Sequence, residues 1–353
     1  MGCRTHSIRA ASAQCCARAG ALLLSLAVNS SVVLDRTIAG RAAWMRADVC
    51  GEDYRVTLSQ RARNELLATA EAMRRQPVPL LALRPDSFDM PACRAAMEEV
   101  RGILRDGVRF ALLSRLPMEE LSLEEAKALY WMLSSMLARP VAQKLDGTIV
   151  YDVHDTGQQA LPGSGIRPDK TNIDLQFHND NAYNATMPVF VGLLCVRPAK
   201  AGGMSRVMSF YTAHNALRER HADVLPRLYQ PFWFDRQREF HPGELSTFSA
   251  PLFIRDGERL SARLSLHQIR GGYALRGGTM DNETTAAVEA IKDVFADPAL
   301  QFDFYLQAGD LQFVANREIG HSRTEFHDHD TVEHRRLLIR LWLRNEGAQG
   351  YMG

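Results

Sequence analysis

His178 and Asp180, two positions apart in the segment Phe177–Tyr183, are the residues of this chain best suited to hold a metal ion. On an extended segment, side chains two positions apart point to the same face. An imidazole and a carboxylate aimed together supply two of the three ligands of the arrangement that holds non-haem Fe(II) and leaves coordination positions open. His321, far downstream in the segment Gly320–Phe326, offers the second imidazole. These residue types predict an Fe(II) site.

A group of arginines near the C-terminus indicates what would share that site. A His-x-Asp triplet can arise by chance in a chain with 11 His and 41 acidic residues, so the prediction depends on its neighbours. Arg336 and Arg340 offer guanidinium groups for a dicarboxylate cosubstrate. A buried carboxylate needs a fork-shaped donor, which favours Arg over Lys. Arg335 competes with Arg336 for this role, and because neighbouring residues on a strand face opposite ways, one of the two points inward.

The elements that must position these residues have strand-like patterns. Ile173–Phe177 alternates apolar and polar residues, and Val189–Val196 is an apolar run typical of a strand buried on both faces. Gly202 and Gly203 form a turn that enters a further strand. The segments 302–306 and 311–315 flank the turn Gly309-Asp310, and we interpret them as a hairpin leading to His321.

Helical patterns lie before and between these strands. We expect the following helices and one intervening strand: a helix over 59–75, a helix opened by Asp89 with Pro91 and closed by Gly107, a strand over 108–113, a helix over 126–137 preceded by the capping box Ser122–Glu125, and a helix over 284–295. Helices before and between antiparallel strands predict a mainly β fold that also contains α-helices. We expect its core to be a double-stranded β-helix (jelly roll) flanked by these helices.

From about residue 105 to the C-terminus, the chain resembles the TauD/TfdA family of Fe(II)/2-oxoglutarate-dependent dioxygenases, within the clavaminate-synthase-like superfamily. The resemblance rests on His-x-Asp, the distal histidine, a Gly-Gly-Met-Ser turn and the two arginines. It implies that His178, Asp180 and His321 bind Fe(II), and that Arg336, Ser205 and Arg340 serve 2-oxoglutarate binding, Arg340 lying near the metal and the substrate. Ser205 stands where the family usually has Thr, and Arg336 follows the distal histidine at the long end of the family's range.

The resemblance also implies a reaction. Oxidative decarboxylation of 2-oxoglutarate to succinate and CO2, with O2 as the second cosubstrate, would be coupled to hydroxylation or a related C–H oxidation of a small polar or anionic substrate. Desaturation and ring formation stay open. Halogenation is disfavoured because related halogenases lack the carboxylate that Asp180 supplies.

Residues beside the ligands are candidates for the substrate pocket. Phe177, Asn181 and Tyr183 flank His178 and Asp180, with packing as the alternative role. Asn316 and Arg323 bracket His321 and are candidates to fix the tautomer of its ring.

Two polar segments and two other classes of protein are the alternatives to this interpretation. Asp235–Glu239 and His327–Asp330 are more typical of solvated or salt-bridged loops than of a site, although the first could touch substrate. A cupin-like metal-binding protein without oxygenase activity (an isomerase, a hydrolase or a ligand binder) could use the same three ligands. A degenerate family member kept for protein interactions is the other alternative, which the complete set of ligands disfavours.

The N-terminal stretch does not fit the rest of the chain. Met1–Val33 contains no acidic residue, is basic early and carries the short apolar run Ala21–Val28. A targeting peptide fits this in part, but no clear small-residue cleavage site follows. We favour a start assigned too early, with translation beginning near Met45. Residues 1–44 are therefore predicted to be a non-core extension, and 45–353 a single jelly-roll oxygenase domain with an N-terminal helical part.

Composition limits the partners. The chain is 46% hydrophobic and 24% charged with a net charge of +1, so nothing in its electrostatics favours nucleic acid or a membrane surface. Besides four cysteines in or just after the N-terminal stretch, Cys93 and Cys195 remain, which is no disulfide framework and suits the cytoplasm. We expect a small-molecule substrate, and self-association into a homo-oligomer stays open.

Overall fold

The core consists of two sheets that face each other and are antiparallel except for the pair β1–β2. The computed structural model describes residues 33–161, 164–257 and 259–353, so the predicted stretch Met1–Val33 lies outside the described residues except for Val33. The larger sheet has the strand order β1-β2-β14-β6-β17-β3, with β4 also paired to β17. Its strands are β1 (Arg55–Thr57), β2 (Phe110–Ser114), β14 (Leu311–Ala315), β6 (Phe190–Arg197), β17 (Leu337–Leu343), β3 (Pro140–Val141) and β4 (Tyr151–Val153).

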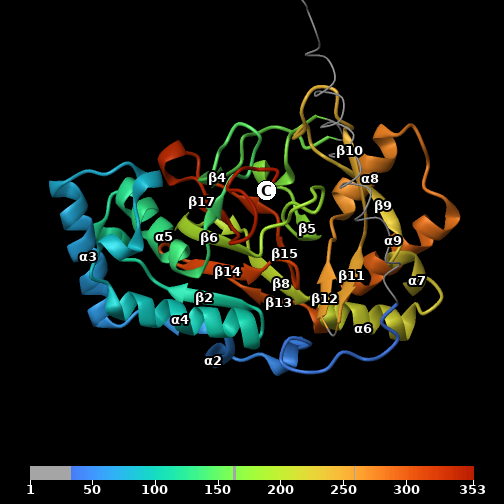
Figure 1. The fold of residues 1–353 in the computed structure, drawn as a ribbon, viewed down its shortest axis with the longest axis horizontal. Helices are drawn as coiled ribbons and strands as arrows, with labels where there is room; N and C mark the ends of the chain where they lie inside the picture. The colour runs from blue at the N-terminus through green and yellow to red at the C-terminus, as the bar shows by residue number, and fades with distance from the viewer. Residues whose placement is uncertain (1–32, 162–163, 258) are drawn as a thin grey trace, which may run out of the picture.

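The smaller sheet carries two of the predicted metal ligands. Its order is β13-β8-β15-β5, formed by β13 (Phe302–Phe304), β8 (Ser205–Ser209), β15 (Ile319–Arg323) and β5 (Leu175–His178). The four strands of this sheet oppose the centre of the larger one, which confirms the predicted jelly-roll core flanked by helices (Figure 1).

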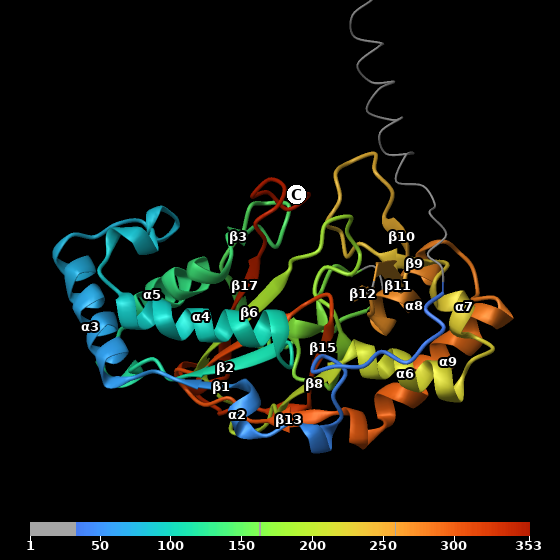
Figure 2. The same cartoon turned by 60° about the horizontal axis from the view of Figure 1, so that its bottom comes forward.

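One group of helices covers the outer face of the larger sheet. It consists of α3 (Gln60–Arg75), α4 (Pro91–Asp106) and α5 (Leu123–Leu137). The short helix α2 (Gly51–Tyr54) lies elsewhere, because Tyr54 packs on Phe110 and Phe302 in the core between the sheets. Figure 2 shows α4 running alongside β2. The alternation of β17 explains the arrangement, because Ile339 and Leu341 pack with the helices, whereas Leu338 and Trp342 belong to the core between the sheets.

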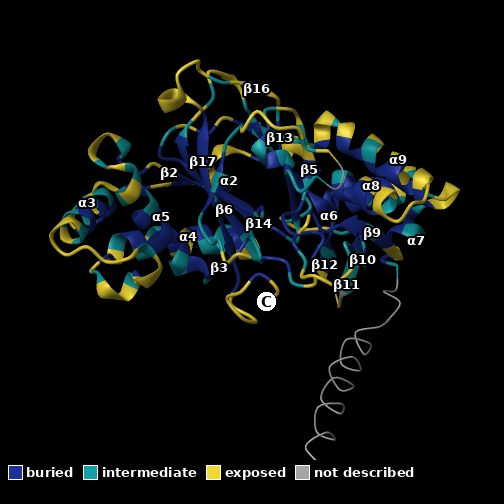
Figure 3. Cartoon of the chain, turned by 90° about the horizontal axis from the view of Figure 1, so that it is seen from above, coloured by how far each residue is buried: buried dark blue, intermediate teal, exposed yellow. Residues whose placement is uncertain are grey.

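A second group of helices lies at the other end of the barrel (Figure 1). It consists of α6 (Phe210–Arg220), α7 (Leu225–Leu228), α8 (Leu266–Leu275) and α9 (Asn282–Ala296). Three two-stranded ribbons lie outside the two sheets: β9 (Pro231–Asp235) with β10 (Thr247–Pro251), β11 (Phe253–Asp256) with β12 (Arg259–Ala262), and β7 (Ala201–Gly202) with β16 (Phe326–His327). Figure 3 shows buried residues concentrated in the central strands and exposed ones on the outer loops.

The predicted helices are present, with small differences at their ends. Ser59 caps α3 by accepting a hydrogen bond from the Ala62 amide, and Ser122 and Glu125 form the predicted capping box of α5. Asp89 is not the cap of α4, because Met90 occupies that position and Pro91 is the first helical residue. None of the helices in the described part of the chain is long and apolar enough to cross a membrane.

The predicted hairpin before His321 is wrong. β13 pairs with β8 in the smaller sheet, whereas β14 pairs with β2 and β6 in the larger one. The turn at Gly309 therefore carries the chain from one sheet to the other. Two neighbouring strand patterns with a turn between them cannot distinguish a hairpin from such a crossing.

The predicted boundary at residue 44 is corrected by the packing of the segment before it. Leu34 and Trp44 are 2% and 3% exposed and belong to the core between the sheets and α6. The Trp44 indole donates to the Val108 carbonyl (2.8 Å), and the Thr212 hydroxyl donates to the Trp44 carbonyl (2.7 Å). Residues 33–44 thus belong to the folded body, while the single domain from residue 45 onward stays a prediction.

Candidate metal centre and its two cavities

His178, Asp180 and His321 come together at one end of the smaller sheet. His178 ends β5 and His321 lies in β15, and the two residues are direct cross-strand partners with ring centroids 4.4 Å apart. Asp180 follows in the turn after β5, with Oδ1 3.6 Å from His178 Nε2 and 3.8 Å from His321 Nε2. The candidate ligand atoms all lie within 4.8 Å of one another, a spacing that one metal ion could bridge.

The backbone and the carboxylate of Asp180 are both held. Asn316 accepts from the Asp180 amide (2.9 Å) and donates to its carbonyl (3.0 Å). The Trp342 indole donates to Oδ2 (2.7 Å), and Arg340 donates to Oδ1 (3.3 Å). Burial opposes ionisation of Asp180, but Arg340 and the two imidazoles outweigh it and hold its pKa well below the usual range. The carboxylate is therefore ionised, as a metal ligand must be.

The two imidazoles are oriented differently. His178 Nδ1 faces the Gln176 carbonyl at 2.9 Å, which leaves Nε2 directed at the site. His321 Nδ1 has no partner within the described ranges. Burial, and then the neighbouring His178, lower the pKa of His321, so this ring is neutral. Two imidazoles and one carboxylate form the donor set that suits Fe(II).

Neither residue expected to set the ring tautomer contacts the His321 ring. Asn316 is engaged with the backbone of Asp180 and with the Pro188 carbonyl. The Arg323 guanidinium donates to the carbonyls of Thr171 and Ile173. Asn316 and Arg323 instead use their hydrogen bonds to hold backbone segments in place, a role that their distance from His321 along the sequence does not predict.

An inner cavity lies behind the triad, between the two sheets. Its wall is formed by Val153, Asp169, Leu175, His178, Leu193, Ser205, Gln312, His321, Ser322, Arg323, Arg336, Leu338 and Arg340. Arg336 is 5% exposed and one of its terminal nitrogens has no partner in the described structure, whereas Arg335 is exposed. Burial lowers the pKa of Arg336 to about 10, which still leaves it charged at neutral pH.

Unpaired polar atoms gather around this inner cavity. Buried oxygens of Asp169, Gln312 and Ser322 lack partners in the described residues, as do nitrogens of His321 and Arg336. Buried polar groups in folded proteins are normally hydrogen-bonded. The inner cavity therefore has the character of a site for a polar molecule.

Arg340 separates the two cavities and is fully engaged. It contacts Oδ2 of Asp169 (2.7 Å), Oδ1 of Asp180 (3.3 Å) and Oε1 of Gln143 (2.7 Å). The structure thus brings Arg340 to the metal carboxylate, and its predicted contact with 2-oxoglutarate stays a prediction.

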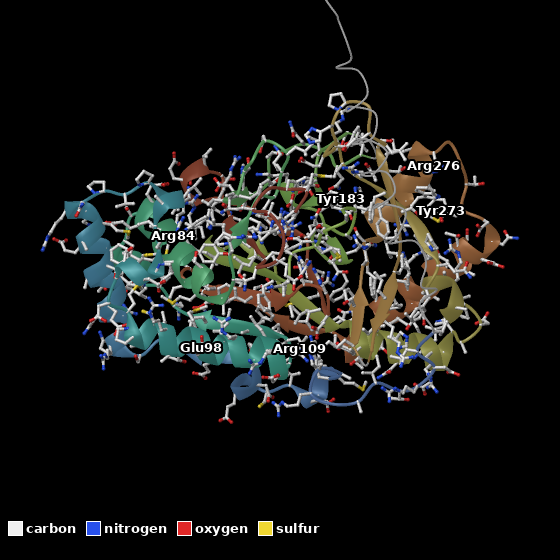
Figure 4. The ribbon with its side chains drawn as sticks, in the orientation of Figure 1. Arg84, Glu98, Arg109, Tyr183, Tyr273 and Arg276 are labelled. Carbon is white, nitrogen blue, oxygen red and sulfur yellow. The ribbon has the colours of Figure 1, made fainter. Side chains whose placement is uncertain are left out.

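An outer pocket of 430 Å³ opens on the other side of the triad. Phe177, Asn181 and Tyr183 lie on its wall, as their positions beside the ligands suggested, whereas Asn316 and Arg323 do not. Figure 4 labels Tyr183 near the middle of the molecule. The other wall residues are Ala160, Arg167, Pro168, Asp169, Ile173, Asp174, Leu175, Gln176, His178, Asp180, Gln237, Ser265, Leu266, His267, Gln268, Arg270, Arg340 and Trp342.

Sequence patterns do not predict the wall formed by Gln237 and α8. The polar segment Asp235–Glu239 is recognisable in the chain, but which of its side chains faces the pocket is not. Gln237 and Arg238 have φ of 51° and 63°, a left-handed backbone that a non-glycine residue rarely adopts. Such strain often lies at ligand sites, but it is visible only in three dimensions.

The chain matches one known family over most of its length. The sequence profile of the taurine catabolism dioxygenase TauD, TfdA family matches residues 78–342. FR-33289 synthase of Streptomyces rubellomurinus (strain ATCC 31215) is 26% identical over 323 residues, 90% of this chain and 94% of the relative. The taurine hydroxylase-like protein SAT17 of Stachybotrys chartarum (strain CBS 109288 / IBT 7711) is 24% identical over 310 residues, 85% and 77% of the two chains.

Solved structures share the fold. Asparagine oxygenase in complex with Fe(II), 2S,3S-3-hydroxyasparagine and succinate has a TM-score of 0.61 at 23% identity, covering 82% of this chain and 93% of that one. The non-haem iron oxygenase OrfP in complex with Fe and α-ketoglutaric acid has a TM-score of 0.60 at 14% identity, covering 83% and 94%. With the family profile and the His-Asp-His group in place, the chain belongs to the TauD/TfdA family and is an Fe(II)- and 2-oxoglutarate-dependent dioxygenase.

Proposed function

We propose that this dioxygenase hydroxylates a small polar or anionic molecule bound in the outer pocket, with Fe(II) on His178, Asp180 and His321. The observation that carries the proposal is that the triad lies where two cavities meet. The inner one contains a buried arginine with an unpartnered nitrogen among the described residues, and the outer one is large enough for a small molecule.

The inner cavity suits 2-oxoglutarate. When bound, Fe(II) with 2-oxoglutarate and O2 supplies the oxidation that replaces a substrate C–H by C–OH while 2-oxoglutarate becomes succinate and CO2. Arg336 supplies the charged fork that the remote carboxylate requires. Ser205 lies on the same wall, and its hydroxyl can donate a second hydrogen bond to that carboxylate.

The surrounding residues hold the ligands and keep water out. Arg340 and Trp342 bind the two oxygens of Asp180, which fixes the orientation of the carboxylate. Leu175, Leu193 and Leu338 contribute apolar wall between the sheets. In a site with little water, the charge interactions of Arg336 and Asp180 are stronger than at the surface.

The names of similar proteins support a small polar substrate. They include a synthase, a taurine hydroxylase-like protein, and oxygenases in complex with hydroxyasparagine or with hydroxylated L-Arg. All are compatible with an outer pocket of 430 Å³ that carries both charged and apolar residues.

The deciding experiment is anaerobic absorption spectroscopy of the protein with Fe(II), to which 2-oxoglutarate is added. We expect a visible charge-transfer band that His178→Ala abolishes. Bound iron without such a band would contradict the proposal and favour the cupin-like alternative. Arg335→Ala is the matched control, because that residue is exposed and should leave the band unchanged.

We also propose that the protein works in the cytoplasm. Cys93 and Cys195 are buried free thiols, and burial raises the pKa of each to about 12, so neither is reactive. Free thiols suit a reducing compartment, which supports the cytoplasm. The expected lack of nucleic-acid and membrane partners, and any homo-oligomer, stay predictions.

A further inference from the structure

A third cavity, with a volume of 400 Å³, adjoins the inner one. It is lined by the segments 198–203 and 305–307 together with Cys195, Arg336 and Leu338. Arg336 and Leu338 also line the inner cavity, and the two cavities share no other wall residue. These two side chains therefore separate the inner cavity from the third one, which we call the Lys200 cavity.

The segment that carries Lys200 is held in a fixed conformation. Gly202 in β7 pairs with Phe326 in β16, and a Cβ on Gly202 would collide with the Glu325 carbonyl oxygen. The Gly203 amide donates to the same carbonyl (3.0 Å). Gly202 and Gly203 have φ of 72° and 69°, a left-handed conformation that glycine adopts without strain. This wall of the cavity is therefore formed before any ligand binds.

The segment 305–307 is tied to the strand that carries Cys195. The Gly309 amide donates to the Cys195 carbonyl (2.8 Å), and the Cys195 amide donates to the Asp310 carbonyl (2.9 Å). Oδ2 of Asp310 in turn accepts from the Gln307 amide (2.8 Å). Both segments of the cavity wall are thus fastened by backbone hydrogen bonds.

The wall of the Lys200 cavity is positively charged. Lys200 is exposed and forms no ion pair or hydrogen bond with a described residue, and Arg336 contributes the second charge. No acidic side chain from the described ranges lines this cavity. Asp328 accepts a hydrogen bond from the Arg336 backbone amide (2.7 Å) but is not on the wall. Two cations on a wall without an acid attract an anion.

Arg336 has more hydrogen-bond donors than the cosubstrate can use. A guanidinium carries five N–H groups and a carboxylate bound in fork geometry accepts two of them, which leaves three. Arg336 is 5% exposed, its Nη1 has no partner, and its one hydrogen bond within the described structure comes from its backbone amide. A buried donor without an acceptor is unfavourable. The remaining donors therefore indicate a second acceptor besides 2-oxoglutarate.

The neutral groups of the wall also suit an anion. Burial raises the pKa of the Cys195 thiol to about 12, so it carries no charge that would oppose one. Tyr305, which is 60% exposed, and the exposed Gln307 offer further donors on the wall. A cavity of 400 Å³ has room for a small metabolite rather than for a single ion.

We propose that the Lys200 cavity is a regulatory site, at which a small molecule with a phosphate, sulfate or carboxylate group binds between Lys200 and Arg336 and weakens the binding of 2-oxoglutarate. Two anions on one buried guanidinium repel each other and share its charge. By linkage, each weakens the binding of the other by the same factor. This coupling rests on the proposed function, because it needs the cosubstrate at Arg336, whereas the anion site does not.

The first test is a calorimetric titration of the full chain loaded with Fe(II) and 2-oxoglutarate, without O2 and at constant ionic strength. The probes are sulfate and glycerol 3-phosphate, and glycerol is the neutral counterpart. We expect at least one anion to bind and glycerol to give no signal. Lys200→Gln should weaken that binding about 5-fold, the effect of one exposed charge pair. Lys200→Glu should abolish it, because the anion then meets a like charge.

The second test measures the coupling. 2-Oxoglutarate is titrated against the visible band of its Fe(II) complex, with and without the anion that binds. We expect saturating anion to raise the Kd of 2-oxoglutarate about 5-fold or more. In Lys200→Glu, the same anion should leave this Kd unchanged.

Two other arginines serve as controls for the location of the anion. Arg335 is exposed, donates to the Asp330 carbonyl (3.3 Å) and is absent from the cavity wall although it is next to Arg336. Arg335→Gln should leave the anion titration unchanged. Arg270 is an exposed arginine of the outer pocket, so Arg270→Gln reports an anion bound there instead. It should also leave the titration unchanged.

Four results would overturn the inference: neither anion binds, Lys200→Glu binds the anion as the parent protein does, Arg270→Gln removes the binding, or a bound anion leaves the Kd of 2-oxoglutarate unchanged. Any of these with the visible band present refutes the regulatory site and leaves the proposed function intact. Absence of the band in the unaltered protein would refute the function itself.

Discussion

The indole nitrogen of Trp342 donates a 2.7 Å hydrogen bond to Oδ2 of Asp180, so the last strand of the larger sheet holds the carboxylate of the candidate metal centre. Trp342 is 2% exposed and lies on the inner side of β17, between the two sheets. The bond thus joins β17 of the larger sheet to a candidate metal ligand in the turn that follows β5 of the smaller sheet.

We expect Trp342→Phe to weaken Fe(II) binding about 10- to 100-fold, the usual effect of removing a partner of a metal ligand. The phenyl ring keeps most of the packing but leaves Oδ2 without this donor. Fe(II) titration of the purified variant measures the change. Trp233→Phe, on β9 away from Asp180, is the control. Equal iron affinity in the two variants would show that the indole bond does not support the ligand.

Arg336→Ala should raise the 2-oxoglutarate requirement by orders of magnitude, because a buried carboxylate that loses its partner costs about 2–5 kcal/mol. Iron binding should be spared, since Arg336 makes no contact with the triad among the bonds found in the described structure. The KM for 2-oxoglutarate and the Kd for Fe(II) measure the two effects. Arg335→Ala should change neither, and a large effect there would reassign the anchor.

Chains truncated to begin at Val33 and at Met45 should differ in thermal stability. A chain that begins at Val33 keeps the described contacts of Leu34 and Trp44, whereas one that begins at Met45 loses both. Removing a buried Trp side chain alone costs about 3–5 kcal/mol. We therefore expect a lower Tm for the shorter chain and for Trp44→Ala in the full chain. Equal melting of all forms would restore residue 45 as the start of the folded body.

Stability should fall in acid through His214 on α6. This side chain is fully buried, and its Nε2 lies 2.7 Å from the Tyr229 hydroxyl. Burial lowers its pKa from 6.5 to about 4. The unfolded chain binds the proton first as the pH falls, so stability is complete above pH 6.5 and is lost between 6.5 and 4, by about 3 kcal/mol.

Urea unfolding of His214→Gln measures this effect. The variant should show a flatter dependence of the unfolding free energy on pH over that window than the parent protein. An unchanged slope would mean that other groups cause the acid sensitivity.

Local chemistry made two parts of the structure predictable. The first residues of α3 and α5 could be predicted because the N-caps Ser59 and Ser122 bond to amides within one turn of the same helix. The closeness of the candidate metal ligands His178 and Asp180 follows from a period of two that coincides with an unusual pair of residue types. Both predictions depend on residues near each other in the chain.

What failed depends on contacts between distant segments. The sequence could not assign β13 and β14 to different sheets. The alternation of apolar and polar residues predicts a strand but does not indicate which other strand it pairs with. Asn316 was expected at a ring and is bound to the backbone of Asp180 instead. The part of the pocket wall that α8 forms was not predicted, because the bridge between Ser265 and His178 that brings α8 beside the triad joins distant segments of the chain.

The location of the ligands along the chain has a consequence for biosynthesis. His178 lies near the middle of the chain, its strand partner His321 comes late, and Trp342 lies in β17, the last strand in the described chain. β17 is inserted between β6 and β3, so the larger sheet is incomplete until it arrives. A growing chain on the ribosome thus offers iron no finished site until β17 has been synthesised and has joined the larger sheet.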